Sequence, residues 1–335
     1  MSRPLVVVDA DVLGRQRTGD ETYVEQLLRA LPAAADDLRF AAITRRPDLV
    51  PEGVEPLALP ARSQELRMAW SVPNLLRRVR PALAHFLHAL PLACPCPAVV
   101  TVQDLSWERD PTVMRTRMRW TFKLVVRRAV RRAERVLTIS ERTKRDLVEL
   151  YGIPEEKIVV THLGVDPAFA RGGEHDSYLL FVSAIEPRKQ PLLAADAACE
   201  LGRKLVVVGP TKDAALAEEL TRRGAELRGY VSKEELVRLY QRAACVVLPS
   251  RYEGFGLPML EAMACGTPVA AADDAAMREV GGDAVVFGAD VTESVRVALA
   301  ARDRLSEAGL ERARRFTWEE TARRTADVYR GVLAR

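Results

Sequence analysis

Aromatic residues are scarce in this chain of 335 residues, at 6% of the total, whereas hydrophobic residues together reach 48%. We therefore expect a core built mostly from aliphatic side chains. No run of 18 apolar residues occurs, which excludes a helix that crosses a membrane. The N-terminus leads directly into an apolar strand, without the longer apolar region and cleavage site of a signal peptide. These absences predict a cytoplasmic globular protein.

Cysteine is sparse as well, with five residues in all. The number is odd, and a single residue separates Cys94 from Cys96, which is closer than the usual zinc-binding spacing. We interpret all five as reduced thiols. We identify neither an Asp-x-Asp motif nor a plausible metal cluster, so we expect no metal cofactor. The formal net charge of +4 is too small to indicate a nucleic-acid partner.

Short apolar runs alternate with helical patterns through both halves of the chain. Continuous apolar runs are typical of buried parallel strands, and parallel strands are joined by crossover helices, so the pattern predicts two doubly wound α/β domains. The predicted strands are Leu5–Val8, Phe40–Ile43, Leu83–Phe86, Ala98–Val102, Val136–Ile139, Ile158–Thr161, Tyr178–Val182, Leu205–Val208, Glu226–Arg228, Cys245–Leu248, Val269–Ala271 and Ala284–Phe287. The predicted helices include Arg115–Arg135, Lys144–Leu150, Leu192–Leu201, Ala214–Arg222, Lys233–Ala243, Met259–Ala264 and Trp318–Leu333.

A segment without periodicity, Pro167–Ser177, marks the predicted boundary between the domains. We place the first domain at 1–166 and the second at 167–316. Thr317 is a suitable N-cap for the last helix. We expect this helix, at about 317–335, to pack back on the first domain.

The most informative stretch is 249–269. It begins where the predicted strand Cys245–Leu248 ends, and a loop with two glycines leads to a helix with Pro258 in its first turn. Backbone N–H groups beside a helix N-terminus favour a phosphate or a polyhydroxylated ligand. In doubly wound folds, ligands bind at the carboxyl ends of the strands. The stretch therefore predicts a ligand site.

Two carboxylates accompany this loop, Glu253 within it and Glu261 in the following helix. Each carboxylate accepts two hydrogen bonds, which matches the paired hydroxyls of a sugar or a ribose. The alternative is a surface turn followed by an ordinary helix, with both side chains solvated.

The stretch resembles the signature of glycosyltransferase family 4 in Glu-Gly-Phe-Gly-Leu-Pro (253–258), Glu-Ala-Met-Ala (261–264) and Gly-Thr-Pro-Val (266–269). This resemblance implies a retaining enzyme with the GT-B fold, in which two Rossmann-like domains face a central cleft. It also implies a nucleotide-sugar donor, GDP- or UDP-linked.

The resemblance assigns roles to residues of this stretch. Glu253 would contact hydroxyls of the donor sugar, and Glu261 would bind the ribose hydroxyls of the nucleotide. The backbone at Phe255, Gly256 and Leu257 would line the donor sugar and its phosphates.

Arg188 and Lys189 follow the predicted strand Tyr178–Val182. Two adjacent cations at a strand end can neutralise the charge that builds on a departing diphosphate. Lys189 matches the lysine that the family places here, whereas Ala184 stands where the family has an arginine, and Arg188 is the candidate to replace it. A solvated pair in a loop is the alternative.

Two weaker signals lie nearby in the second half. Tyr230 and Val231 resemble the short family segment that lies against the nucleotide base, and otherwise mark a strand end and turn. Gly209 follows the strand Leu205–Val208 and fits a turn that faces the same site.

In the first half, Gly19 lies in Arg15–Tyr23, which joins the first strand to the first helix. Glycine permits a close approach of ligand to backbone. The segment resembles the family's glycine loop, and its Arg-Thr-Gly-Asp-Glu-Thr-Tyr string resembles a bacterial subgroup related to mannosyl- and rhamnosyltransferases. Otherwise it is a plain loop with Asp20 as a helix cap.

Gln103 occupies the position where the family usually has a histidine near the donor sugar. Glutamine donates and accepts hydrogen bonds but does not shuttle a proton, so we expect a positioning role. Ser140 fits a cleft segment of the family and a helix cap equally well. His85 and His88 follow a strand and fit packing or catalysis.

The predicted helix Arg115–Arg135 carries nine basic residues along with Trp120 and Phe122. It is either a solvated helix face or a patch that contacts anionic membrane surface or a lipid-linked acceptor.

We predict a retaining transferase that moves a hexosyl unit, mannose-like by preference, from a nucleotide sugar to a glycan or lipid-linked acceptor in envelope or polysaccharide synthesis. A sugar-nucleotide epimerase on the same fold and a non-catalytic nucleotide-sugar-binding subunit are the alternatives. Gln103 and Ala184 are the departures from the family pattern that favour the non-catalytic alternative. A phosphorylase would need a pyridoxal lysine, and no segment indicates one.

Overall fold

The computed structural model describes residues 3–15, 18–60, 63–110, 114, 116–173 and 176–335. The chain forms two compact units. The first contains Met1–Glu108, Thr116–Gly164 and Thr317–Arg335, and the second contains Val165–Phe316 with Arg109–Arg115. The long central section of each unit is thus continuous in sequence, and the last helix belongs to the first unit.

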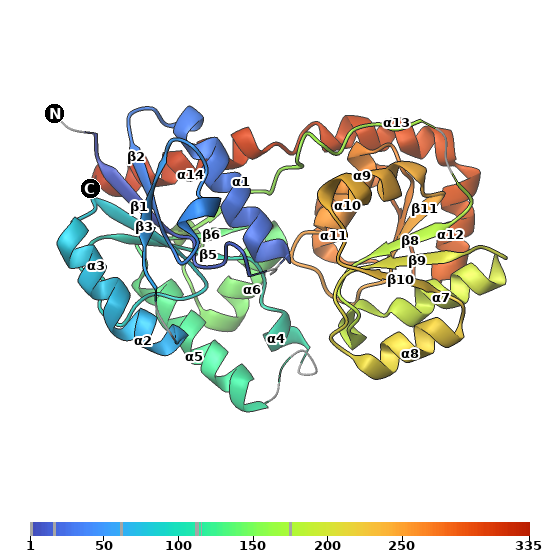
Figure 1. Ribbon diagram of the computed structural model, residues 1–335, viewed down its shortest axis with the longest axis horizontal. Coiled ribbons are helices and arrows are strands. Elements are labelled where there is room, and N and C mark those ends of the chain that lie inside the picture. Colours follow the sequence, from blue (N-terminus) through green and yellow to red (C-terminus); the bar gives the residue numbers. More distant parts are fainter. Residues whose placement is uncertain (1–2, 16–17, 61–62, 111–113, 115, 174–175) are drawn as a thin grey trace. The chain divides into compact units, whose positions relative to one another are not determined.

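The first unit is built on a seven-stranded parallel sheet with the strand order β3-β2-β1-β4-β5-β6-β7 (Figure 1). Its strands are β1 (Leu5–Asp9), β2 (Arg39–Thr44), β3 (Val54–Ala58), β4 (Leu83–Leu87), β5 (Ala98–Val102), β6 (Arg135–Thr138) and β7 (Ile158–Val160). Its helices are α1 (Thr18–Ala34), α2 (Gln64–Leu66), α3 (Val72–Val79), α4 (Ser106–Arg109), α5 (Thr116–Arg132), α6 (Glu141–Tyr151) and α14 (Trp318–Leu333), with a π-helical turn at Arg67–Ser71.

The second unit has a six-stranded parallel sheet with the order β10-β9-β8-β11-β12-β13. Its strands are β8 (Leu179–Val182), β9 (Leu205–Val208), β10 (Glu226–Gly229), β11 (Cys245–Leu248), β12 (Val269–Ala271) and β13 (Val286–Phe287). Its helices are α7 (Pro191–Glu200), α8 (Ala214–Arg222), α9 (Lys233–Arg242), α10 (Leu257–Ala264), α11 (Ala275–Gly281), α12 (Val291–Ala300) and α13 (Arg302–Ala313).

Both strand orders reverse direction once, and this reversal positions the sites described below. In the first unit β1 leads outward to β2, whereas β4 leads the opposite way to β5. In the second unit β8 leads to β9 and β11 leads to β12 in the opposite direction. Because the crossovers are right-handed, those on the two sides of the reversal lie on opposite faces of the sheet. No crossover helix therefore covers the carboxyl ends of the two strands at the reversal, which are β1 and β4 in the first unit and β8 and β11 in the second. These strand ends border a crevice.

Aliphatic side chains dominate the buried core of both units, as the low aromatic content predicts. In the second unit, one cluster joins the inner strands of the sheet to α7 and α12 through valine, leucine and alanine side chains. The central strands β5 and β11 are buried along their whole length. Their near-continuous apolar sequence follows from helices that cover both faces of a parallel sheet.

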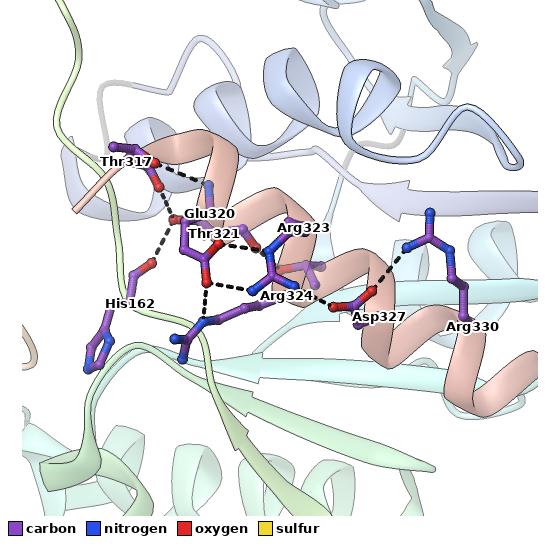
Figure 2. Close-up of polar contacts among 9 residues, drawn as sticks. His162, Thr317, Glu320, Thr321, Arg323, Arg324, Asp327 and Arg330 are labelled. Atoms are coloured by element: carbon purple, nitrogen blue, oxygen red, sulfur yellow. Dashed lines mark hydrogen bonds and ion pairs between the residues drawn. The ribbon is translucent and has the colours of Figure 1, made fainter. Parts of the chain in front are cut away.

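The last helix, α14, begins where it was predicted. The Thr317 side chain accepts a hydrogen bond from Glu320 N at 3.2 Å, and Thr321 Oγ1 donates to His162 O at 2.6 Å (Figure 2). On its exposed side, Glu320 pairs with Arg323 and Arg324 (Figure 2). The cap and the bond to His162 fix the start of the helix on the first unit.

The structure corrects several predicted boundaries. The basic helix ends at Arg132, and Arg135 begins β6; Arg115 lies outside the described residues. The predicted strand Ala284–Phe287 shortens to Val286–Phe287, because Gly282–Ala284 forms a 3-10 turn. Strand β3 was not predicted. It is an edge strand in which only Val54 is buried, so its sequence lacks a continuous apolar run.

His85 is a packing residue. Its Nδ1 lies 2.6 Å from the Tyr329 hydroxyl of α14, and its Nε2 lies 2.7 Å from Thr101 Oγ1. Thr101 Oγ1 also lies 2.9 Å from the Tyr23 hydroxyl. Burial lowers the pKa of His85 to about 3, so the imidazole is neutral in the folded protein. This buried network joins the sheet to α1 and α14.

The network predicts a pH dependence of stability. The pKa of His85 is about 3 when folded and about 6.5 when unfolded, so the unfolded state binds an extra proton between these values. The free energy of unfolding should therefore fall as the pH falls below 6.5, with His85 contributing about 1.4 kcal/mol per pH unit. Urea unfolding of the wild type and His85→Gln between pH 6 and 5 checks this. Equal slopes for the two proteins would contradict it.

Candidate active site

The loops after β8 and β11 carry most of the residues singled out by the sequence, and the structure brings these two loops together. Lys189 Nζ lies 2.6 Å from Glu253 Oε1, and Arg251 N donates to Arg188 O at 3.0 Å. Arg188 Nη1 donates to Tyr252 O at 2.5 Å. These three contacts join the loops at the crevice between β8 and β11 in the second unit.

The Lys189–Glu253 pair is largely withdrawn from water, with side chains only 12% and 15% exposed. Burial alone would raise the pKa of Glu253, but the cations of Lys189 and Arg188 outweigh burial and hold the pKa below its ordinary value. Glu253 is therefore an ionised acceptor. Its backbone is also held, because Glu253 N donates to Asp274 Oδ2 at 3.4 Å.

Arg188 is committed to protein acceptors. Besides Tyr252 O, its guanidinium donates to Glu186 Oε1 at 2.8 Å, and Lys212 Nζ contacts the other oxygen of Glu186 at 2.9 Å. Three cations, Arg188, Lys189 and Lys212, meet three carboxylates at this corner, those of Glu186, Glu253 and Asp274. Lys189 lies against Glu253, and Arg188 joins the two loops.

Gly256 turns the chain into α10. Its φ of 96° lies in the left-handed region, which favours glycine, and its carbonyl accepts from Met259 N and Leu260 N. Pro258 lies in the first turn, as predicted, and Leu257 begins the helix. The side chain of Phe255 is buried and packs edge-on against Phe316, at 5.9 Å between ring centroids. Phe255 is therefore anchored in the core, and only its backbone can line a ligand.

Glu261 lies in α10 and accepts a hydrogen bond from the Tyr240 hydroxyl at 2.7 Å. Burial raises the pKa of Glu261 to about 7; the bond from Tyr240 opposes this rise, and the charge of Asp166 adds to it. Asp166 is itself paired with Lys233 at 2.7 Å. One carboxylate oxygen of Glu261 thus accepts from Tyr240, and the carboxyl group titrates near neutral pH.

Gly209 and the segment after β10 lie next to one another. Gly209 N donates to Gly229 O at 2.9 Å, and a Cβ on Gly209 would lie 2.2 Å from Ser183 O. The glycine is required because the loop after β8 passes directly over it. Tyr230 is 48% exposed and Val231 is half-buried, so both can offer surface to a ligand.

The remaining predicted site residues belong to the first unit. Gly19 lies in the first turn of α1, and a Cβ there would lie 3.7 Å from Gln103 Oε1, an ordinary contact. The structure thus brings Gly19 and Gln103 together. Ser140 caps α6, its side chain accepting from Thr143 N. Gln16 and Arg17 of the same loop lie outside the described residues.

The expectation that the chain has no Asp-x-Asp motif is wrong, because Asp9-Ala10-Asp11 is such a pair. Asp9 ends β1 and Asp11 follows it, and both approach the buried guanidinium of Arg67; burial opposes the charge of Arg67, but these carboxylates raise its pKa. Asp11 also contacts Arg15 at 2.6 Å and Arg45 at 2.9 Å. Arginines therefore neutralise this pair. Among the described residues no group of three or more His, Cys, Asp or Glu side chains could hold a metal ion.

Asp274 was not predicted as a residue of this site. It caps α11 by accepting from Ala276 N and Met277 N, and it holds the backbone of Glu253. An aspartate before a helical pattern is a recognisable N-cap signal. Its contact with the Glu253 loop, however, depends on tertiary structure that the sequence does not display.

Comparison with known proteins identifies two family models along the chain. The model "Glycosyltransferase Family 4" matches residues 17–169, and "Glycosyl transferases group 1" matches residues 169–317. Together they account for all but the two ends of the chain.

Two curated relatives are mannosyltransferases. O-antigen chain mannosyltransferase B of Escherichia coli is 29% identical over 70% of this chain and 70% of its own length. MMP alpha-(1->4)-mannosyltransferase of Mycolicibacterium hassiacum is 32% identical over 70% of this chain and 62% of its own.

Among solved structures, sucrose-phosphate synthase from Thermosynechococcus elongatus superimposes with a TM-score of 0.79 over 99% of this chain and 100% of that one, at 18% identity. This likeness concerns the fold, and it confirms the predicted GT-B class.

The joined loops predict an energetic coupling between Lys189 and Glu253. Replacing Lys189 by Met leaves a carboxylate unpaired in a poorly hydrated place, which should lower the free energy of unfolding by about 1–3 kcal/mol. Adding Glu253→Gln removes that charge and should recover much of the loss. Urea denaturation of the four proteins of this double-mutant cycle measures the coupling. Strictly additive effects would contradict a direct pair.

Proposed function

Because the chain belongs to glycosyltransferase family 4, we propose that it transfers a hexosyl unit, mannose by preference, from a nucleoside-diphosphate sugar with retention of anomeric configuration. The donor binds to the second unit and the acceptor, a glycan or lipid-linked sugar, binds to the first. The observation that carries the proposal is the Lys189–Glu253 pair at the crevice between β8 and β11.

The donor site follows from the charges and the glycine turn. A diphosphate beside Lys189 would meet the ammonium of Lys189 and the N-terminus of α10, both of which stabilise negative charge. The neighbouring carboxylate of Glu253 would then accept hydrogen bonds from hydroxyls of the sugar. Glu261 offers its second oxygen to the ribose, and Tyr230 and Val231 offer surface to the base.

The chemistry requires stabilisation of the leaving group more than a strong base. As the glycosidic bond to the diphosphate breaks, its bridging oxygen gains negative charge, which the ammonium of Lys189 stabilises. The departing phosphate oxygen accepts the proton of the attacking hydroxyl, so that the new bond forms on the face the diphosphate leaves. In this proposal the lysine supplies the positive charge that a divalent ion would otherwise provide.

The mannose preference is supported by the names of the two curated relatives described above. GDP-mannose is therefore the first donor to test, with UDP-glucose as its comparison. An envelope or polysaccharide acceptor is proposed on the same basis, from the O-antigen chain named in one relative.

Removing Lys189 or Glu253 tests the transferase directly. Lys189→Ala and Glu253→Ala should each reduce turnover of the preferred nucleotide sugar by about 10²–10³-fold. Lys189→Ala removes the charge that stabilises the leaving group, and Glu253→Ala removes the acceptor of hydrogen bonds from the sugar hydroxyls. Lys204→Ala, which removes an exposed lysine paired with Glu226 in the same unit, is the matched control and should keep full turnover. Release of nucleoside diphosphate, with and without EDTA, provides the measurement.

A wild-type protein that binds nucleotide sugars without turning any over would instead identify a non-catalytic binding subunit. An inhibition by EDTA that added Mg²⁺ reverses would contradict the metal-independent mechanism.

We further propose that the acceptor lies at a membrane surface, and the exposed side chains of α5 support this. Met118, Trp120 and Leu124 are more than half exposed, and Arg117 and Arg131 are exposed on the same helix. Apolar and basic side chains together are typical of helices that lie at anionic membrane surfaces. Among the described residues no helix is long and apolar enough to span a membrane, so such contact would be peripheral.

Vesicle binding tests this surface. The protein should sediment with phosphatidylglycerol vesicles at low salt and dissociate as salt screens the arginines. Trp120→Ser should weaken binding about 10-fold through lost apolar burial, and Leu193→Ser, an exposed leucine of the second unit, should not. Equal binding to neutral vesicles, or no effect of Trp120→Ser, would contradict a role for α5.

A further inference from the structure

The loop between β4 and β5, at residues 88–97, carries two of the five cysteines of the chain. Cys94 and Cys96 stand one residue apart, and their Sγ atoms lie 3.9 Å from each other as a thiol–thiol hydrogen bond. Both side chains are partly exposed, so a small molecule in solution can reach them. The proposed donor site uses neither thiol, since its residues belong to the second unit.

This loop is held in place on both sides of the cysteines. On one side, the Arg128 guanidinium of α5 donates to the carbonyl oxygens of residues 90–92, at 3.1, 3.1 and 2.7 Å. On the other side, Pro97 O accepts from Ala84 N of β4 at 3.0 Å. Pro95, between the two cysteines, restricts the backbone further because its ring fixes φ. The two thiols are therefore kept close together with little conformational freedom left to lose.

The pair has the geometry of a potential disulfide and lacks the ligands of a structural zinc site. Such a zinc site takes four ligands, and the described part of the chain contains no group of three or more His, Cys, Asp or Glu side chains that could hold a metal ion. Cα atoms two residues apart are separated by at most about 7 Å, which overlaps the separations of about 4.4–6.8 Å found across disulfides. The chain spacing therefore permits a bond between the two sulfur atoms.

The two thiols differ in reactivity. The hydrogen bond from Cys96 lowers the pKa of the Cys94 thiol because it stabilises the thiolate, and burial opposes this effect only in part. The same hydrogen bond, together with burial, raises the pKa of Cys96. The thiolate is the nucleophilic form of cysteine, so Cys94 is the attacking thiol of the pair. Cys245 and Cys265 do not compete, because both are buried in the second unit and burial raises the pKa of each to about 12.

We propose that Cys94 and Cys96 form a reversible redox site that takes a low-molecular-weight disulfide as its oxidant. The Cys94 thiolate attacks one sulfur of the small disulfide and expels the other as a thiolate, which leaves a mixed disulfide on Cys94. Cys96 then loses its proton to solvent and attacks the Cys94 sulfur, and the second small thiol leaves. The small disulfide is thus reduced to two thiols while the protein dithiol is oxidised to an intramolecular disulfide.

The intramolecular disulfide should be easily reduced again. One residue separates the cysteines, so the bond closes a small ring, and strained disulfides have the more oxidising potentials. Partial exposure of both cysteines also lets a small thiol attack the bond from solvent. The pair therefore responds to the balance of thiols and disulfides around it. This inference concerns the first unit alone and stands whether or not the chain is a transferase.

Reaction of the full-length reduced protein with glutathione disulfide near neutral pH tests the site. After an acid quench, the remaining thiols are alkylated and the peptides are read by mass spectrometry. The peptide with Cys94 and Cys96 should lose two hydrogens and carry neither glutathione nor the alkylating group, and dithiothreitol should restore both thiols. Cys199, an exposed thiol of α7, is the internal control and should keep any glutathione that it takes up.

The dependence on glutathione concentration separates an intramolecular disulfide from a mixed one. Closing the ring consumes one disulfide and releases two thiols, so an about tenfold dilution of both at constant ratio should raise the ratio of oxidised to reduced dithiol about 10-fold. The fraction of Cys199 that carries glutathione should stay constant, because that exchange consumes one disulfide and releases one thiol.

Single substitutions assign the two roles. Cys96→Ser keeps a hydroxyl that donates to the Cys94 thiolate but removes the second thiol, so a glutathione adduct should accumulate on Cys94. Cys94→Ala removes the attacking thiol and the hydrogen-bond partner of Cys96, and should slow the reaction of this loop about 10-fold. A wild-type protein that retains glutathione on Cys94, or whose two thiols stay reduced when Cys199 is modified, would overturn the proposal.

Discussion

The ion pair of Lys189 and Glu253 is the interaction on which the proposed chemistry of this protein depends. It forms where β8 and β11 lie side by side and their crossover helices leave in opposite directions, so backbone loops border the crevice. Both side chains are largely buried; Lys189 and Arg188 stabilise the charge of Glu253, whereas Glu253 stabilises the charge of Lys189 against burial and the like charge of Arg188. A diphosphate that replaces Glu253 as the partner of Lys189 would free the carboxylate to accept hydroxyls.

Both sheets reverse their strand order once, but different side chains surround the reversal in the two units. In the second unit the charged groups at the reversal pair with one another, and Lys189 lies beside the N-terminal loop of α10 through its contact with Glu253. In the first unit arginines neutralise Asp9 and Asp11 at the corresponding reversal.

The sequence predicted the sheets well because parallel strands buried on both faces are continuously apolar, as in β5 and β11. It missed β3, where only one residue is buried, and the helices α2, α3, α4, α11, α12 and α13. The first four of these helices have eight residues or fewer, too few to display a helical period, and α12 and α13 mix charged with apolar residues. Lys189 and Glu253 stand out in the sequence as candidate site residues because both match segments of the family pattern. Their pairing, the bracing role of Arg188 and the support from Asp274 depend on contacts between loops far apart in sequence, which no local pattern displays.

A crystal structure of the protein with bound GDP tests the central claim most directly. The account predicts phosphate oxygens within about 3 Å of Lys189 Nζ, the diphosphate at the N-terminus of α10, and the ribose hydroxyls on Glu261. A nucleotide bound away from the β8–β11 crevice, or a Lys189–Glu253 pair that stays closed with the diphosphate facing other side chains, would contradict it.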